Sequence, residues 1–222
     1  LNCGCKLTKN QPIFMPLFKS INNRENTQVY IWKITESEAF LRTGIELSEN
    51  SKNRLFTMSS ELHRRGFLSI RHLLIHAGYT DLDLYYSEHG KPHLTDEKYI
   101  SITHSFTFSG VIVSDKEVGI DIEMQRDKIA VIAHKFVDYE FNYLDKSADD
   151  YINKLTVIWG IKESLYKLFA TPGMLFKEHF LVIPFTFDDG ETIAWIDYKD
   201  RKYRYNTAFL EFEGFTCAYV VP

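Results

Sequence analysis

The chain has 222 residues, a formal net charge of −4, 45% hydrophobic residues and 25% charged residues. This composition is ordinary for a soluble globular protein that buries one substantial core or two small ones. The acidic balance argues against a general binder of nucleic acid or of anionic membranes, because such a binder needs a basic surface.

Cysteine usage and hydropathy indicate a reducing, aqueous compartment. Cys3, Cys5 and Cys217 form no Cys-x-x-Cys motif and no zinc-type spacing with His, so we expect neither a disulfide framework nor a zinc site. The apolar runs are far shorter than the roughly 18 residues of a membrane span, and the N-terminus has no signal pattern. We therefore expect a cytoplasmic protein that binds no membrane.

The chain divides into an extension and two halves. It opens on Leu1, and residues 1–14 show no periodicity before Met15. We expect Met15 to be the natural start and residues 1–14 to be a non-native or disordered extension. We place an N-terminal α+β half at residues 15–115 and a C-terminal α+β half at residues 116–222. No linker rich in Pro, Gly or Ser separates them, so we expect the two halves to pack tightly.

In the N-terminal half, the patterns predict strands around a long amphipathic helix. The helix runs from about Ser59 to Ala77, where Gly78 supplies the residue that commonly ends a helix. The other expected elements are strands at Val29–Ile34, Leu82–Ser87, Ile100–Thr103 and Ser109–Ser114, and a short helix at Glu36–Leu41.

In the C-terminal half, the patterns predict a strand, helices and then a series of hairpins. The expected strands are Glu117–Glu123, Phe180–Phe187, Thr192–Tyr198, Arg204–Glu211 and Thr216–Val221, and the helices are Ile129–Val137, Asp138–Leu144 and Asn153–Phe169. Each half thus has an antiparallel sheet with flanking helices, which is the α+β class.

The most informative segment is Val118-Gly119-Ile120-Asp121-Ile122-Glu123. Alternate side chains of a strand share a face, so Asp121 and Glu123 point the same way, about 7 Å apart along the backbone. Ile120 and Ile122 face the other side.

A second segment, Trp159-Gly160-Ile161-Lys162-Glu163-Ser164-Leu165-Tyr166-Lys167, lies in the expected helix Asn153–Phe169. Residues four apart share a helix face, so Glu163 and Lys167 lie together. The residues of the predicted buried stripe are Ile158, Ile161, Leu165 and Leu168. Trp159 is most simply a core aromatic.

Three carboxylates and one ammonium group suit a magnesium-bound polyphosphate, because Mg²⁺ prefers oxygen ligands and a lysine offsets phosphate charge. The alternative is that Asp121 and Glu123 lie on a solvated strand face, and that Glu163 and Lys167 form an ordinary surface pair. The acids stand within apolar runs, where an unpaired charge is costly, and this favours the metal interpretation.

Four motifs in one order resemble the 4′-phosphopantetheinyl transferases of the surfactin-synthetase-activating type. The motifs are Gly90-Lys91-Pro92, Ser101-Ile102-Thr103-His104-Ser105, Val118 to Glu123 and Trp159 to Lys167. The resemblance implies two similar α+β halves packed as a pseudo-dimer with coenzyme A between them. It departs after Lys167, where Leu168 to Gly173 replace a Gly-rich continuation.

The resemblance implies a role for each site residue. Mg²⁺ is held by Asp121, Glu123 and Glu163, while Glu163 and Lys167 are catalytic. The residues implied on the coenzyme A side are Lys91, Pro92, Thr103, His104, Arg65 and Arg71. Of the two arginines, Arg65 is the first choice for a clamp on the 3′-phosphate.

The function implied is Mg²⁺-dependent transfer of 4′-phosphopantetheine from coenzyme A to a serine of an apo acyl or peptidyl carrier protein, with release of 3′,5′-ADP. We expect a monomer. Two alternatives remain open: a non-catalytic coenzyme A or nucleotide-binding protein, and a Mg²⁺-dependent nuclease. The second is weakened because the strand lacks a lysine after Glu123.

Overall fold

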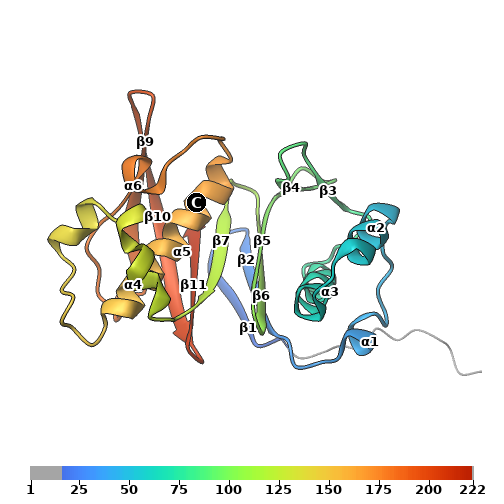
Figure 1. The fold of residues 1–222 in the computed structure, drawn as a ribbon. Coiled ribbons are helices and arrows are strands. Elements are labelled where there is room, and N and C mark those ends of the chain that lie inside the picture. The colour runs from blue at the N-terminus through green and yellow to red at the C-terminus, as the bar shows by residue number, and fades with distance from the viewer. Residues whose placement is uncertain (1–16, 222) are drawn as a thin grey trace, which may run out of the picture.

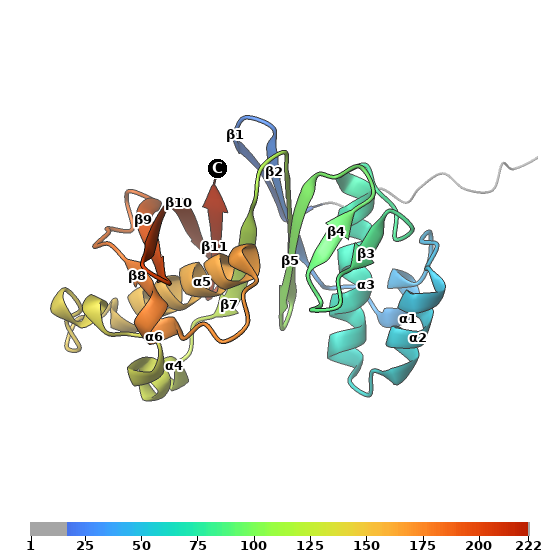
Figure 2. The same cartoon turned by 90° about the horizontal axis from the view of Figure 1, so that it is seen from above.

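The computed structural model describes residues 17–221. Two antiparallel sheets face each other, and helices cover the outer face of each sheet (Figures 1 and 2). The prediction for residues 1–14 lies outside the described residues. The predicted class of antiparallel sheets with flanking helices is confirmed. The pseudo-dimer of two similar halves and the boundary at residue 115 stay predictions.

The first sheet has the strand order β1-β2-β6-β5. Its strands are β1 (Lys19–Arg24), β2 (Thr27–Lys33), β5 (Tyr99–Ser105) and β6 (Phe108–Ser114), and a separate hairpin is formed by β3 (Leu84–Tyr86) and β4 (Pro92–Leu94). The helices of this half are α1 (Glu38–Leu41), α2 (Glu49–Thr57) and α3 (Glu61–His76). The long helix and four predicted strands of this half are confirmed.

Three elements of this half were not predicted: β1, α2 and the three-residue strand β4. Strand β1 has no fully buried residue, and α2 buries only Ser51 and Leu55, so neither segment shows an apolar period. Helix α2 begins at its cap, because the Ser48 hydroxyl accepts a hydrogen bond from the Ser51 amide. Tertiary contacts, rather than hydrophobic pattern, therefore fix β1 and α2.

The second sheet has the order β7-β11-β10-β9-β8. Its strands are β7 (Gly119–Met124), β8 (Phe180–Val182), β9 (Glu191–Tyr198), β10 (Arg201–Phe212) and β11 (Phe215–Val221). The helical elements are α4 (Lys128–Ile132), α5 (Tyr151–Phe169) and α6 (Phe176–His179), with 3₁₀ turns η1 (Ala133–Lys135) and η2 (Tyr139–Asn142).

Three predictions in this half need correction. The helix expected at 129–137 is the short α4 followed by η1, and the helix expected at 138–144 is only the 3₁₀ turn η2. The strand expected at 180–187 ends at Val182, where Pro184 soon follows and cannot donate a ladder hydrogen bond. Helix α6 was not predicted because four residues carry no period.

The buried apolar side chains form three layers, one under α3, one between the two sheets and one under α5. Ile120 and Ile122 lie in the middle layer, which leaves Asp121 and Glu123 on the opposite face of β7, toward α5. The predicted alternation along β7 is therefore confirmed.

Helix α5 lies against β7 because Gly119 has no side chain. A Cβ at Gly119 would stand 1.9 Å from the carbonyl oxygen of Ser164. The Ser164 hydroxyl donates to the Ala218 carbonyl of β11, 2.9 Å away. The predicted stripe of α5 is also confirmed, since Ile158, Ile161, Leu165 and Leu168 are buried. Glu163 and Lys167 are thereby directed at β7.

Candidate functional site

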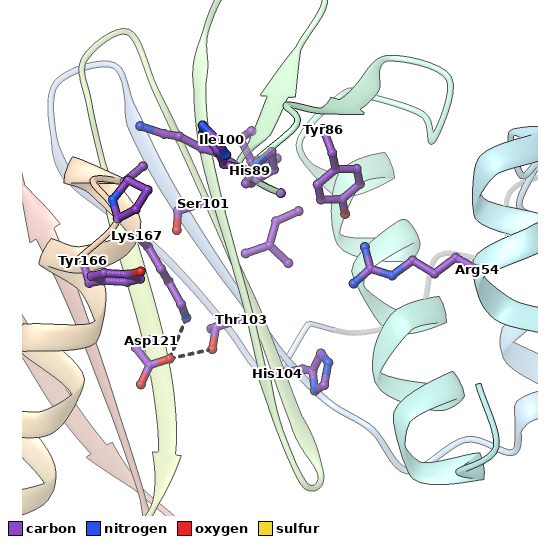
Figure 3. A pocket seen from close by; sticks show the side chains of 16 residues that line it. Arg54, Tyr86, His89, Ile100, Ser101, Thr103, His104, Asp121, Tyr166 and Lys167 are labelled. Atoms are coloured by element: carbon purple, nitrogen blue, oxygen red, sulfur yellow. Dashed lines mark hydrogen bonds and ion pairs between the residues drawn. The ribbon is translucent and has the colours of Figure 1, made fainter. Parts of the chain in front are cut away.

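A cavity of about 480 Å³ lies where the two halves meet (Figure 3). The N-terminal half contributes β5, the β3–β4 hairpin and one side chain of α2, while the C-terminal half contributes β7, the end of α5 and the segment after it. The lining residues with polar, charged or phenolic side chains are Arg54, Tyr86, His89, Lys91, Ser101, Thr103, His104, Asp121, Tyr166 and Lys167. Motifs that are far apart in the sequence thus meet at one place.

Asp121 is the centre of the polar contacts. Its Oδ1 atom accepts hydrogen bonds from Lys167 Nζ at 2.6 Å and from Thr103 Oγ1 at 3.1 Å (Figure 3). Its Oδ2 atom is buried and has no hydrogen-bond partner among residues 17–221. A buried carboxylate oxygen without a partner is costly, so this atom is suited to a cationic ligand.

The hydroxyl groups of β5 hold the free edge of β7. The Ile120 amide donates to Ser101 Oγ at 3.2 Å, and the Ile122 amide donates to Thr103 Oγ1 at 3.1 Å. These two side chains replace a backbone ladder between β5 and β7. Thr103 therefore joins the two halves and contacts Asp121, in addition to lining the cavity.

Glu163 and Lys167 come from successive turns of α5. Lys167 Nζ also donates to the Ile120 carbonyl at 2.9 Å, so it holds both the backbone and the side chain of β7. Burial raises the pKa of Glu163 to about 7, with Asp121 and Glu123 adding to the effect and Lys167 opposing it. A carboxyl group with this pKa is poised to exchange a proton near neutral pH.

Glu123 lies beside Trp159, whose indole N–H donates to Glu123 Oε1 at 3.3 Å. Burial raises the pKa of Glu123, and the charge of Asp121 raises it further. Trp159 packs edge-on against Phe136 and in a tilted arrangement against Phe176, as a core aromatic does. Trp159 therefore packs α5 against its neighbours and also orients the Glu123 carboxylate.

The three acids suit a divalent cation by their chemistry. Among residues 17–221, no three His, Cys, Asp or Glu side chains are gathered closely enough to hold a metal ion. Asp121 nevertheless raises the pKa of both Glu123 and Glu163, which shows mutual repulsion. A cation between them would relieve that repulsion and give Asp121 Oδ2 a partner. The oxygen donors therefore suit a hard ion such as Mg²⁺ by their chemistry, although the three acids are not gathered into a metal site among residues 17–221.

The loop Gly90-Lys91-Pro92 lies at the cavity, with Gly90 at φ +81°, a conformation that favours glycine. Lys91 Nζ donates to the carbonyl of Leu168, 2.7 Å away, at the C-terminal end of α5. The cation thus links the two halves and complements the negative end of the helix dipole. Pro92 begins β4 and lines the same wall.

His104 lies at the end of the cavity nearest α3. Its side chain still reaches solvent, yet the surrounding protein desolvates the ring and lowers its pKa, and His63, Lys167 and Arg54 add to the effect. Gly66 of α3 lies against the ring, because a Cβ there would stand 3.2 Å from His104 Cγ. The imidazole therefore lies near the cationic side chains of Lys167 and Arg54, which favour an anionic ligand.

The two arginines expected at a phosphate do not line the cavity. Arg71 is buried in the N-terminal core, where its Nε donates to Asp81 Oδ1 at 2.8 Å. Arg65 donates from Nη2 to the Ile34 carbonyl at 3.1 Å. The helical spacing placed both correctly on α3 but could not say which face the core would cover.

Arg54 is the cavity arginine that sequence reasoning missed. It lies on α2 with its guanidinium 5.4 Å from the Tyr86 ring and 5.7 Å from the Phe67 ring. These aromatic faces hold an exposed arginine toward the cavity (Figure 3). The only sequence signal was the serine cap at the start of α2, which would have revealed the helix but not its direction.

A family model matches the second half of the chain. Residues 117–220, from just before β7 into β11, match the model of the 4′-phosphopantetheinyl transferase superfamily. The match supports transferase activity on coenzyme A and carrier proteins in general. It does not extend to residues 17–116, whose part in the cavity rests on geometry. No curated protein matches the chain.

Proposed function

We propose that this protein transfers 4′-phosphopantetheine from coenzyme A to a serine of an apo acyl or peptidyl carrier protein, a Mg²⁺-dependent holo-carrier-protein synthase activity that releases 3′,5′-ADP. The single observation that carries the proposal is the buried Oδ2 atom of Asp121, which has no partner among residues 17–221, while Oδ1 of the same carboxylate accepts from Lys167 and both residues line a cavity shared by the two halves. The superfamily match over residues 117–220 supports it.

Coenzyme A presents an adenine, a 3′-phosphate and a pyrophosphate. Arg54, Lys91 and His104 supply cationic or donor groups along the N-terminal wall, and Tyr86 supplies an aromatic face. Arginine binds phosphate in a fork geometry, which suits Arg54 to the 3′-phosphate. With the nucleotide on this wall, the pyrophosphate lies toward Asp121 and Lys167.

Asp121, Glu123 and Glu163 are the residues that would hold the metal ion, with the pyrophosphate completing its shell. Bound Mg²⁺ neutralises phosphate charge and favours displacement at phosphorus. Lys167 adds a second positive charge beside the phosphates and fixes Asp121 through its 2.6 Å contact. Alignment and charge stabilisation are the main sources of rate in such transfers.

In the proposed step, the serine oxygen forms a bond to the β-phosphorus and the bridging P–O bond breaks, so that its electron pair leaves with 3′,5′-ADP. The serine proton goes to Glu163, directly or through water. A pKa of about 7 suits Glu163 to this transfer, while metal ligation would make it a weaker base.

The test is mass spectrometry of apo acyl and peptidyl carrier proteins incubated with the protein, coenzyme A and Mg²⁺. A gain of one phosphopantetheine per carrier serine is the expected result. A serine-to-alanine carrier serves as the control. No mass gain with any carrier, in the presence of a folded protein and saturating Mg²⁺, would overturn the proposal.

Two other functions predict different titrations. A non-catalytic coenzyme A or nucleotide-binding protein would bind coenzyme A in a calorimeter without transferring it, and a Mg²⁺-dependent nuclease would bind duplex DNA. We expect coenzyme A binding with Mg²⁺ and no DNA binding. We further propose that the protein is a monomer and is located in the cytoplasm. Among residues 17–221, no helix has the length and apolar content that crossing a membrane requires.

A further inference from the structure

A fully buried ion pair lies behind the acids, outside the cavity. Lys162 has none of its side chain exposed and Glu140 only 1%, and Lys162 Nζ lies 2.8 Å from Glu140 Oε1. Nothing in the proposed transfer uses either group. Lysine and glutamate side chains are rarely buried this completely, and when they are buried they are usually paired, as here. The role of this pair is therefore of interest.

The ammonium group of Lys162 has three acceptors for its three N–H bonds. Besides Glu140, it donates to the carbonyl of Phe136 at 2.6 Å and to the carbonyl of Phe176 at 3.3 Å. Phe136 directly follows η1, and Phe176 is the first residue of α6. One side chain of α5 therefore holds two neighbouring segments by their backbones.

Both carboxylate oxygens of Glu140 also have hydrogen-bond partners. Its Oε1 atom also accepts a hydrogen bond from the Val182 amide at 2.9 Å, and its Oε2 atom accepts one from the Asp138 amide at 3.2 Å. Through the pair, α5 is tied to η1, η2, α6 and β8. A buried pair held by several directional contacts has a more narrowly defined geometry than an apolar contact, which can slide.

The ion pair affects the site because Lys162 directly precedes Glu163 in α5. Successive helix residues are about 100° apart, so fixing Lys162 fixes the direction in which Glu163 points. On the opposite side, the Ser164 hydroxyl holds α5 to β11, and Gly119 lets the helix touch β7. Lys167, one turn after Glu163, then meets Asp121 at 2.6 Å.

Stability alone is a poor reason for this pair. Desolvation of two charges offsets most of their attraction, and well-packed apolar residues of similar volume are often as stabilising. Directional contacts, by contrast, select one rotation of a helix among several that an apolar interface tolerates. The pair is therefore better explained by the geometry it imposes than by the free energy it adds.

We propose that the Glu140–Lys162 ion pair is a positioning element that sets the rotation of α5 and thereby aligns Glu163 and Lys167 with Asp121. This inference rests on the proposed function for its effect on transfer. The effect of the pair on the geometry of α5 does not depend on the proposed function.

The test compares three proteins. The first is wild type, the second is the apolar double variant Glu140→Leu with Lys162→Met, and the third is Asp150→Asn with Lys154→Met. The third removes a partly exposed ion pair of 2.9 Å at the start of the same helix and serves as the matched control. Each is measured for unfolding by urea, for Mg²⁺ affinity by calorimetry without coenzyme A, and for single-turnover transfer.

We expect the apolar double variant to fold, to bind Mg²⁺ at least 10-fold more weakly and to transfer at least 10-fold more slowly, with the KM for coenzyme A changed less than twofold. A crystal structure of it should show the Lys167–Asp121 contact lengthened. The control should match wild type in every measurement. The single variant Glu140→Gln keeps an acceptor for the Val182 amide. Its Mg²⁺ affinity and transfer rate should lie between those of wild type and of the apolar double variant.

A folded apolar variant with wild-type Mg²⁺ affinity, transfer rate and Lys167–Asp121 contact would overturn the proposal. So would a double variant that fails to fold, because the pair would then serve the fold itself. If wild type transfers nothing to any carrier, the proposed function fails. The Mg²⁺ titration and the crystal structure would still decide whether the pair positions α5.

Discussion

Lys167 Nζ lies 2.6 Å from Asp121 Oδ1 and 2.9 Å from the Ile120 carbonyl oxygen, so one ammonium group from α5 holds both the side chain and the backbone of β7. The contact joins residues 46 positions apart in the chain. The second oxygen of Asp121 is buried and has no partner in the described part of the chain, which makes Asp121 the first residue to test.

Asp121→Ala should leave the fold intact and lower transfer by roughly 10²–10³-fold or more, the loss typical of removing a pre-organised electrostatic contact. Asp121→Asn keeps the shape and should lose nearly as much, because the amide has no charge for a metal ion. Single-turnover transfer and circular dichroism are the measurements. Near-normal turnover of folded Asp121→Ala at saturating Mg²⁺ would remove Asp121 from the metal site.

Arg54→Gln should weaken binding of coenzyme A by about 1.5–3 kcal/mol, while binding of dephospho-coenzyme A changes little, because a charge-assisted contact counts only when its phosphate is present. Arg65→Gln is the contrasting variant, since Arg65 bonds the Ile34 carbonyl and should affect both ligands alike. Calorimetry with each ligand makes the comparison. Equal losses for Arg54→Gln with the two ligands would place Arg54 away from the 3′-phosphate.

Glu163→Gln separates the two roles of this acid. As a metal ligand only, the variant should need more Mg²⁺ and recover at high Mg²⁺, because the amide oxygen remains a neutral donor. As a base, it should lose 10²–10⁴-fold in rate, and Mg²⁺ should not restore it. We expect a large rate loss with modest rescue, measured as single-turnover rate against Mg²⁺ concentration.

The pH dependence of transfer follows from the raised pKa of Glu163, about 7, caused by burial and by Asp121 and Glu123. A base must be deprotonated, so the rate should rise with pH through this pKa and level off above it. Raising Mg²⁺ should move the midpoint to lower pH, because a nearby cation favours the carboxylate. A flat profile between pH 6 and 8 at low Mg²⁺ would argue against Glu163 as the base.

Gly119→Ala should destabilise the fold by about 3 kcal/mol or more, since its Cβ would stand 1.9 Å from the Ser164 carbonyl oxygen and backbone would have to move. Gly160→Ala is the matched variant on α5, where the new Cβ meets only the Ala218 methyl at 3.2 Å. Alanine also favours the helix there, so its cost should be far smaller. Urea unfolding compares the two, and similar losses would contradict the close approach of β7 and α5.

Acid should weaken the N-terminal half through Asp81. Burial alone would raise the pKa of Asp81, but the Arg71 guanidinium and hydrogen bonds from Ser48 and Ser51 outweigh it and hold the pKa below its ordinary value. The stabilisation is therefore complete above the unfolded-state pKa, about 3.9, and is lost as pH falls through the lower native pKa.

The variant Asp81→Asn should remove about 3–5 kcal/mol at pH 7, because Arg71 is left buried without its anion. It should also remove part of the acid sensitivity. Urea unfolding of wild type and variant between pH 2 and 7 tests both effects. If the unfolding free energies of wild type and variant changed in parallel over that pH range, Asp81 would not be the cause of the stability lost in acid.

The sequence by itself determined the local geometry of the site. A strand alternates every second residue and a helix repeats every 3.6, so backbone geometry alone places Asp121 beside Glu123 and Glu163 beside Lys167. The structure confirms both faces, with Ile120 in the middle core layer and Lys167 at β7. The long helices and most strands were predictable for the same reason.

Only the tertiary structure decided which distant groups meet. Arg54 reaches the cavity from a helix with no apolar period, while Arg71 is drawn into the core by Asp81. Thr103 bonds the amide of β7, and Lys162 pairs with Glu140 behind the site. Such partners are chosen by packing between segments tens of residues apart, and the local periods of a sequence carry no information about that packing.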